Sequence, residues 1–177
     1  LSFVIKKKRP CRKNTMSGWA LKNQYAILRD DLDRKSVMRE AAGMAQIAAT
    51  QGEVPVGAIL YVGKKLIASS FNQSNQLKDP TAHAEILVLR AAAKKLGNYR
   101  LNDGVLFTTL EPCPMCAGAV LESRIKSLIF GAYDRKNGAA GSVYNIVAKN
   151  PNIEIVGGVE EYLCSSLLTK FFKEKRN

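Results

Sequence analysis

The chain has 177 residues, of which 46% are hydrophobic, and this is enough for one domain with its own core. No apolar run is long enough to cross a membrane, which argues against an integral membrane protein. The formal net charge of +12 is compatible with affinity for nucleic acid but does not establish it.

The charge is unevenly distributed along the chain. Of the 27 basic residues eight precede Asp30, which leaves 19 against all 15 acidic residues, a net charge of +4, from Asp30 onward. We therefore expect residues 1–35 to form a basic, disordered N-terminal extension and residues 36–177 to form the folded domain.

The pattern of apolar residues predicts strands and helices along the rest of the chain. Residues 36–50 have helical spacing, and residues 54–62 and 66–70 are strand-like and joined by a turn at Gly63-Lys64. The elements expected next are a helix over 86–96, a strand over 105–110, a helix through 117–122, strands over 127–132 and 153–156, and a helix over 160–173. Because strand–helix–strand units imply parallel crossovers, the sheet should be mixed. We predict an α/β fold, a three-layer α/β/α sandwich with a five-stranded mixed sheet and helices on both faces.

Two short motifs stand at the starts of two of these helices. One is His83-Ala84-Glu85, with the only histidine of the chain, and the other is Pro112-Cys113-Pro114-Met115-Cys116. Three ligands of these types bind zinc and leave one position open for a water, which zinc makes acidic. Glu85 is then placed to move protons. An H-x-E followed by P-C-x-x-C is typical of zinc-dependent nucleobase deaminases, so we predict a zinc site at His83, Cys113 and Cys116.

The expected helix starts suit this chemistry. Asp79 and Thr81 are good N-caps for the first helix, which would place His83 and Glu85 in its first turn. The two motif cysteines, three residues apart, would share one face at the start of the second helix. The partial positive charge of both helix starts would favour thiolate over thiol.

Other roles exist for a Cys-x-x-Cys pair. A redox pair normally stands in a thioredoxin-like context, which nothing else in the sequence supports. A closed structural zinc site needs a fourth ligand, and only Cys11 in the basic tail and Cys164 on an apolar helix remain. With two of four cysteines assigned to zinc, the composition fits a reducing compartment, and we expect a cytoplasmic protein.

Over about residues 37–175 the chain resembles the bacterial tRNA-specific adenosine deaminases of the cytidine deaminase-like superfamily. The zinc signature belongs to the whole superfamily, whereas the segments Gly138-Ala139-Ala140-Gly141-Ser142 and Phe171-Phe172 are more particular. The resemblance implies the cytidine-deaminase-like sandwich. It also implies an enzyme that hydrolytically deaminates the wobble adenosine, position 34, of a tRNA anticodon to inosine.

The resemblance assigns roles to individual residues. It implies one zinc ion per chain on the three ligands already named, with Glu85 as the proton shuttle. Asn72 would contact the target base, and Asp134 and Lys136 would lie in the loop beside the anticodon. A turn-forming role for Asn72 and a local capping role for Asp134 stay open. The implied partners are a tRNA anticodon stem-loop, from arginine tRNA, and a second copy in a homodimer, with no membrane.

Two other functions remain open from the sequence. The first is deamination of a free nucleobase or nucleoside such as guanine or cytosine, which needs no basic surface. A histidine as the first ligand argues against the small free-cytidine enzymes, and the C-terminal cluster Lys170, Lys173, Lys175 and Arg176 favours RNA. The second is a non-catalytic RNA-binding relative, which the presence of Glu85 argues against.

Overall fold

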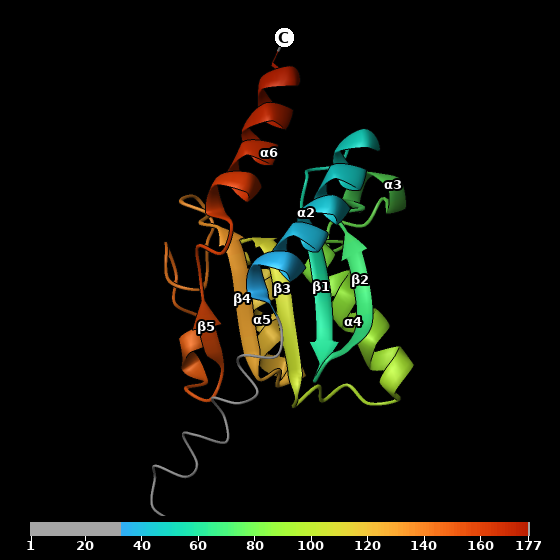
Figure 1. The fold of residues 1–177 in the computed structure, drawn as a ribbon, viewed down its shortest axis with the longest axis vertical. Coiled ribbons are helices and arrows are strands. Elements are labelled where there is room, and N and C mark those ends of the chain that lie inside the picture. Colours follow the sequence, from blue (N-terminus) through green and yellow to red (C-terminus); the bar gives the residue numbers. More distant parts are fainter. Residues whose placement is uncertain (1–32, 177) are drawn as a thin grey trace, which may run out of the picture. The chain divides into compact units, whose positions relative to one another are not determined.

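The computed structural model of the chain describes residues 33–176 (Figure 1). Residues 1–32, most of the expected extension, lie outside this range, so their disorder stays a prediction. The first described element is helix α2, Arg34–Thr50, which begins two residues before the expected Ser36. It begins there because the Asp33 side chain accepts a hydrogen bond from the backbone N–H of Lys35 at 3.1 Å and so caps the helix.

Five strands form one sheet. Their bounds are β1 Gly57–Val62, β2 Lys65–Phe71, β3 Gly104–Leu110, β4 Ser127–Ala132 and β5 Glu154–Val156. The spatial order is β2-β1-β3-β4-β5. Strand β1 is antiparallel to both of its neighbours, β2 and β3, whereas β3, β4 and β5 run parallel to one another. The predicted five-stranded mixed sheet is confirmed.

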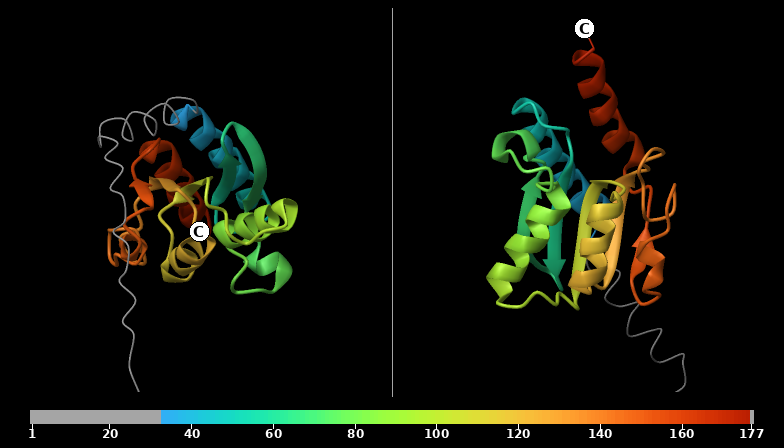
Figure 2. Two further views of the ribbon diagram at one scale, coloured as in Figure 1. Left: turned by 90° about the horizontal axis from the view of Figure 1, so that it is seen from below. Right: turned by 180° about the vertical axis from the view of Figure 1, so that it is seen from behind.

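Helices cover both faces of this sheet (Figures 1 and 2). Helices α2 and α6, Glu161–Glu174, lie on one face, and α4, Ala84–Leu96, and α5, Pro114–Ser123, lie on the other. A short helix α3, Ser74–Leu77, and a 3-10 turn η1, Val147–Lys149, lie in the connections and were not expected. The predicted three-layer sandwich is confirmed. Among the described residues, no helix combines the length and the apolar character needed to cross a membrane.

Each face of the sheet has its own core. Side chains alternate along a strand, so adjacent positions point to opposite faces. The cluster against α4 and α5 takes Leu60, Leu106 and Leu128 from the central strands. The cluster against α2 takes their neighbours Ile59, Phe107 and Ile129. Because Phe107 pairs with Ile59 on β1 and with Ile129 on β4, these three residues form one row across the sheet.

Strand β1 begins at Gly57 rather than at Val54, where the apolar pattern places it. Pro55 has no N–H to donate, and the N–H of Val56 bonds to the carbonyl of Val54 at 2.8 Å, so these residues form a tight turn. A Cβ at Gly57 would collide with the backbone of α2 at Ala41. The start of the strand is therefore set by the close approach of a helix, which a pattern of apolar residues does not record.

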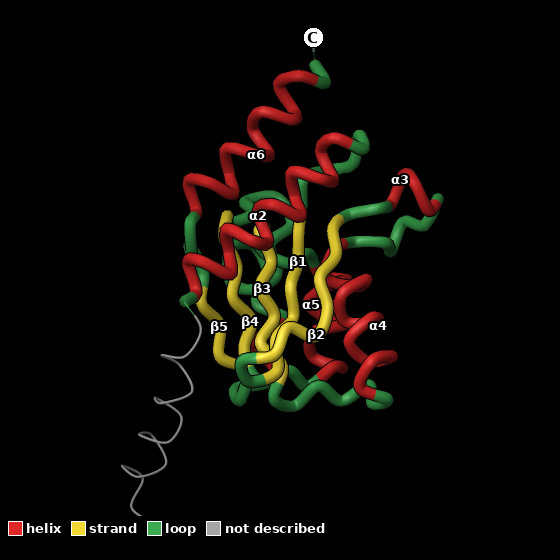
Figure 3. Tube along the Cα trace, turned by 45° about the vertical axis from the view of Figure 1, so that its right-hand side comes forward, coloured by secondary structure: helices red, strands yellow, loops and turns green. Residues whose placement is uncertain are grey.

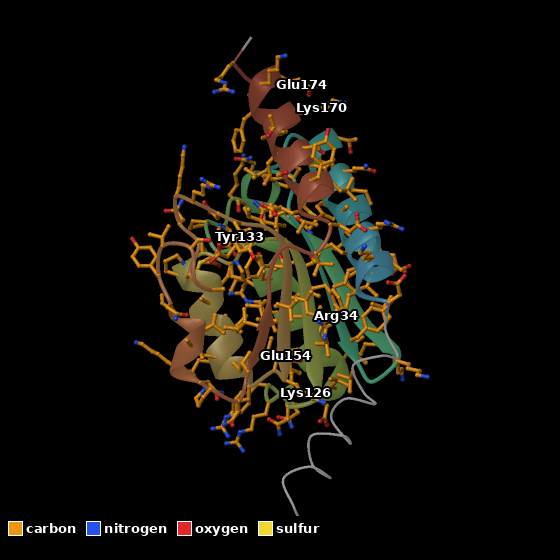
Figure 4. All side chains as sticks on the ribbon, turned by 60° about the vertical axis from the view of Figure 1, so that its left-hand side comes forward. Arg34, Lys126, Tyr133, Glu154, Lys170 and Glu174 are labelled. Carbon is orange, nitrogen blue, oxygen red and sulfur yellow. The ribbon has the colours of Figure 1, made fainter. Side chains whose placement is uncertain are left out.

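An ion pair joins the start of α2 to the edge strand β5. Arg34 Nη2 lies 3.4 Å from Glu154 Oε1, and the hydroxyl of Ser127 donates to the other oxygen of the same carboxylate at 3.2 Å. Figure 4 places Arg34 and Glu154 at the same end of the molecule as Lys126. Because both charged side chains are partly exposed, the pair contributes at most about 1 kcal/mol.

Replacing Met38 by alanine should lower the free energy of unfolding by about 2–5 kcal/mol, because a fully buried side chain of the α2 cluster is removed and a cavity remains. Urea unfolding followed by circular dichroism measures the change. Ile47→Ala on the same helix is the control, since Ile47 is 38% exposed, and it should cost less than about 1 kcal/mol. Equal losses in the two variants would contradict the packing of α2 described above.

Candidate active site

Three strands end at the same edge of the sheet, and a candidate site segment follows each of them. Strands β2 and β3 are both antiparallel to β1, so β2, β3 and β4 point the same way. Asn72 follows β2, Glu111–Cys113 follow β3, and Tyr133–Lys136 follow β4. In Figure 3 these strand ends lie at the upper edge, toward α3. The carboxyl ends of strands are where open α/β sheets place their sites.

The three candidate metal ligands are held at two helix starts. His83 is the N-cap of α4, Cys113 is the N-cap of α5, and Cys116 lies in the first turn of α5. His83 Nδ1 lies 3.7 Å from the sulfur of Cys113 and 3.5 Å from that of Cys116, and the three donor atoms lie within 4.8 Å of one another. Two such donors on a tetrahedral zinc, with bonds of about 2.0–2.3 Å, would be about 3.6 Å apart. The donor types and their spacing therefore fit zinc.

His83 lies just before α4 rather than in its first turn, so the expected position is wrong by one residue. The expected caps close an earlier turn instead, in which Asp79 Oδ1 accepts from the N–H and the hydroxyl of Thr81, both at 2.7 Å. The backbone of His83 is extended, with φ −73° and ψ 151°. Residues two apart within a helix point in different directions. Because the backbone of His83 is extended and not helical, its ring can lie near Glu85.

The two cysteines differ in acidity because the thiol of Cys116 donates a hydrogen bond to the sulfur of Cys113. Hydrogen bonding from Cys116, and then from His83, lowers the pKa of the Cys113 thiol to about 4, against the opposing effect of burial. The pKa of Cys116 is raised, because its thiol donates to Cys113 and is buried. The pKa of His83 is raised by its hydrogen bond with Cys113. A thiolate at Cys113 is the form of cysteine that binds metals.

Glu85 is a buried carboxyl group beside the candidate ligands. It lies in the first turn of α4 and is only 3% exposed. Burial, which disfavours the charged form, raises the pKa of Glu85 to about 7, although the charge of His83 acts against this shift. A carboxyl group with a pKa near neutrality can both take up and release a proton, which is what a general acid–base group does.

Asn72 connects the end of β2 to the start of α4. It is buried, and its Oδ1 accepts a hydrogen bond from the backbone N–H of Ala84 at 3.2 Å. Within residues 33–176 its Nδ2 has no hydrogen-bond partner of its own. The side chain therefore holds the helix that follows His83 and keeps its Nδ2 N–H donors for a bound molecule.

The other two candidate residues lie in the loop after β4. Asp134 Oδ1 accepts from the backbone N–H of Lys136 at 2.9 Å and of Asn137 at 3.1 Å, which is the local capping role that the sequence left open. Lys136 is exposed. It lines a groove of about 440 Å³ together with residues near the end of α6, namely Leu168, Thr169, Phe172, Lys175 and Arg176.

Two further buried carboxylates support the site, and the sequence reasoning assigned them no role. Glu53 and Glu111 are each 1% exposed. Glu53 accepts from the backbone N–H of Gln76 at 2.7 Å and from the amide of Asn75 at 3.2 Å, and so holds α3. Glu111 accepts from three backbone N–H groups of the loop after β4. Each glutamate stands shortly before a proline, in Glu53-Val54-Pro55 and in Glu111-Pro112, which is the only sequence signal for them.

Comparison with known proteins places the chain in a family. The sequence profile of the MafB19-like deaminases matches residues 32–176. The tRNA-specific adenosine deaminase of Haemophilus influenzae is 46% identical over 155 residues, which cover 85% of this chain and 89% of that protein. The chain belongs to the tRNA-specific adenosine deaminase family.

Solved structures agree with this placement of the deaminase. A structure from studies of A-to-I editing by tRNA:A34 deaminases at the wobble position superposes with a TM-score of 0.71 and 39% identity, over 74% of this chain and 97% of the other. A guanine deaminase from Bacillus subtilis superposes less well, with a TM-score of 0.57 and 32% identity, over 68% and 78% of the two chains. The predicted fold, family and deaminase activity are thus confirmed.

Asn72→Ala should lower the free energy of unfolding of the deaminase by about 1 kcal/mol, and Asn72→Asp should lower it by less, because its retained hydrogen bond offsets the cost of burying a charge. Aspartate keeps an oxygen for the N–H of Ala84 and adds negative charge at a helix start, and alanine removes the acceptor. Urea unfolding of both variants measures the difference. A loss as large in the aspartate variant as in the alanine variant would mean that this oxygen does not hold α4.

Proposed function

We propose that this protein is a zinc-dependent hydrolase that converts the wobble adenosine, position 34, of a tRNA to inosine. The observation that carries the proposal is a buried Glu85 next to the cluster of His83, Cys113 and Cys116. The chain that carries these residues is 46% identical to a protein named tRNA-specific adenosine deaminase.

The three clustered side chains would hold the zinc ion and leave one position open. When bound, zinc supplies a Lewis acid that brings the pKa of a water molecule down toward neutrality. The starts of α4 and α5 both face this position, since His83 and Cys113 are their N-caps. Their partial positive charge favours the thiolate ligands and any negative charge that develops during the reaction.

Glu85 is the group that moves protons in this proposal. It takes one proton from the attacking water and delivers it to ring nitrogen N1 as the oxygen bonds to C6 of adenine. It then carries the second proton of that water to the amino group, and the C6–N bond breaks. The products are inosine and ammonia, so one water is consumed for each base. Burial keeps competing water away from this carboxyl group.

The remaining candidate residues would bind the RNA. The base must leave the anticodon stack to reach the metal, and Nδ2 of Asn72 can donate to an acceptor on it. Lys136 shares its groove with Lys175, Arg176 and the ring of Phe172, and cations beside an aromatic ring suit a single-stranded nucleic acid. The arginine tRNA and the homodimer rest on the resemblance alone.

A substrate panel tests this proposal against its main alternative. Inosine should form in an adenosine-34 anticodon stem-loop, with little product from free adenosine, cytosine or guanine, because contacts to the loop supply the energy that orients the base. Chromatography of nuclease-digested RNA and of the free bases measures the products. Comparable efficiency on free guanine would move the assignment to a nucleobase deaminase, for which the guanine deaminase of B. subtilis at 32% identity is a precedent.

Glu85→Gln should keep about one zinc ion per chain and lose turnover by about 10²–10⁴-fold, because the amide preserves the shape but cannot accept the proton. Elemental analysis and single-turnover kinetics measure the two properties. Cys116→Ala is the paired variant, and it should lose zinc together with activity. Turnover near the wild-type rate in the glutamine variant would show that another residue moves the proton.

A further inference from the structure

The side chain of Glu111 lies between the segment that carries Cys113 and the loop of residues 133–142. Glu111 follows β3 and precedes Cys113 by two residues. The 133–142 loop follows β4 and carries Asp134 and Lys136, the two candidate RNA contacts after that strand. Glu111 is almost completely buried and does not belong to the cluster of His83, Cys113 and Cys116.

The carboxylate of Glu111 accepts hydrogen bonds from three backbone N–H groups of the loop. The N–H of Asp134 donates to Oε2 at 3.1 Å, and the N–H groups of Ala140 and Ser142 donate to Oε1 at 3.0 Å each. Hydrogen bonds to an ionised acceptor are stronger than those between neutral groups. One side chain thus fixes the loop near both of its ends.

The backbone of the same segment adds one bond to the end of β4 and one to the loop. The N–H of Glu111 donates to the carbonyl of Ala132 at 2.8 Å, and the N–H of Ala139 donates to the carbonyl of Pro112 at 2.8 Å. Cys113 is the next residue along the chain. The loop is therefore attached directly to the segment that presents a candidate metal ligand, and not only to the body of the sheet.

The 133–142 loop is shaped around this carboxylate. A Cβ at Gly138 would collide with the carboxylate of Glu111 and with the carbonyl of Asp134, so a residue without a side chain is required there. A buried carboxylate is costly unless donors surround it, and an apolar side chain would fill the same space at lower cost. Unlike an apolar side chain, the carboxylate accepts the N–H groups of the loop and so fixes the arrangement of the loop backbone.

We propose that Glu111 is a positioning residue that fixes the 133–142 loop relative to the ligand segment and thereby sets affinity for the RNA substrate rather than the rate of the chemical step. The kinetic part of this inference rests on the proposed function. The structural part, a clamp on the loop, does not depend on it.

Hydrogen exchange tests the clamp in the full-length, zinc-loaded protein. In Glu111→Gln an NH2 group replaces one of the two accepting oxygens, so either the bond from Asp134 or the pair from Ala140 and Ser142 is lost. The amide hydrogens that lose their acceptor should exchange about 10- to 100-fold faster, as measured by NMR. Glu122→Gln is the matched control, because it removes the same charge from an exposed position on α5 and should leave these amides unchanged. Unchanged exchange in Glu111→Gln would overturn the clamp.

Steady-state kinetics on the anticodon stem-loop test the consequence for substrate. Glu111→Gln should raise KM about tenfold and change kcat by less than about threefold, with zinc content unchanged, whereas Glu122→Gln should change none of them. A fall in kcat with KM preserved, or loss of zinc, would overturn the proposal and assign Glu111 to the metal site. Failure of the wild-type protein to act on the stem-loop would reject the proposed function, and hydrogen exchange would still decide on the clamp.

A second variant leaves the carboxylate in place. Gly138→Ala places a methyl group against the carboxylate of Glu111 and so disturbs the same contact. This variant should reproduce the faster exchange and the raised KM. Gly43→Ala on α2 is its control, because a Cβ there meets nothing within 4 Å, and it should leave both properties unchanged. If Glu111→Gln does not fold, this pair carries the test, and wild-type behaviour of Gly138→Ala would then overturn the proposal.

Discussion

The shared direction of β2, β3 and β4 determines where the site can be. Because β2 and β3 are both antiparallel to β1, and β4 is parallel to β3, the chain leaves the sheet three times at one edge. Helices α4 and α5 start at this edge, with His83 and Cys113 as their N-caps. Two helix dipoles thus act on one group of ligands, which no single helix could achieve.

The difference between a structural and a reactive carboxyl group lies in what surrounds it. Glu53, Glu85 and Glu111 are all nearly inaccessible to solvent. The carboxylate of Glu111 accepts from three backbone N–H groups of the loop after β4, and that of Glu53 accepts from one backbone N–H and one side-chain amide of α3. For Glu85 burial outweighs hydrogen bonding, and its pKa rises to about 7. The same residue type thus holds backbone in place at two positions, and at the third it has the acidity that the proposed proton carrier needs.

The sequence predicts the sheet, its helices and the clustering of His83, Cys113 and Cys116 well, because strand and helix periodicities are strong and a single histidine leaves little choice. It fails where distant segments decide local structure. The start of β1 depends on the backbone of α2 at Gly57, and the N-cap position of His83 follows from a turn that Asp79 closes earlier. The role of Glu111 depends on donors 23 to 31 residues away, and glutamate is ordinarily a surface residue.

The division of the core by the sheet has a consequence for how such an enzyme can change over time. Neither the candidate ligands nor Glu85 lie on α2, and the cluster packed against this helix is separate from the one beneath α4 and α5. Substitutions in the cluster packed against α2 can change the stability of the fold and leave the residues of the candidate site as they are. A lineage that moves to a warmer or colder habitat can therefore adjust one layer while its chemistry stays fixed in the other.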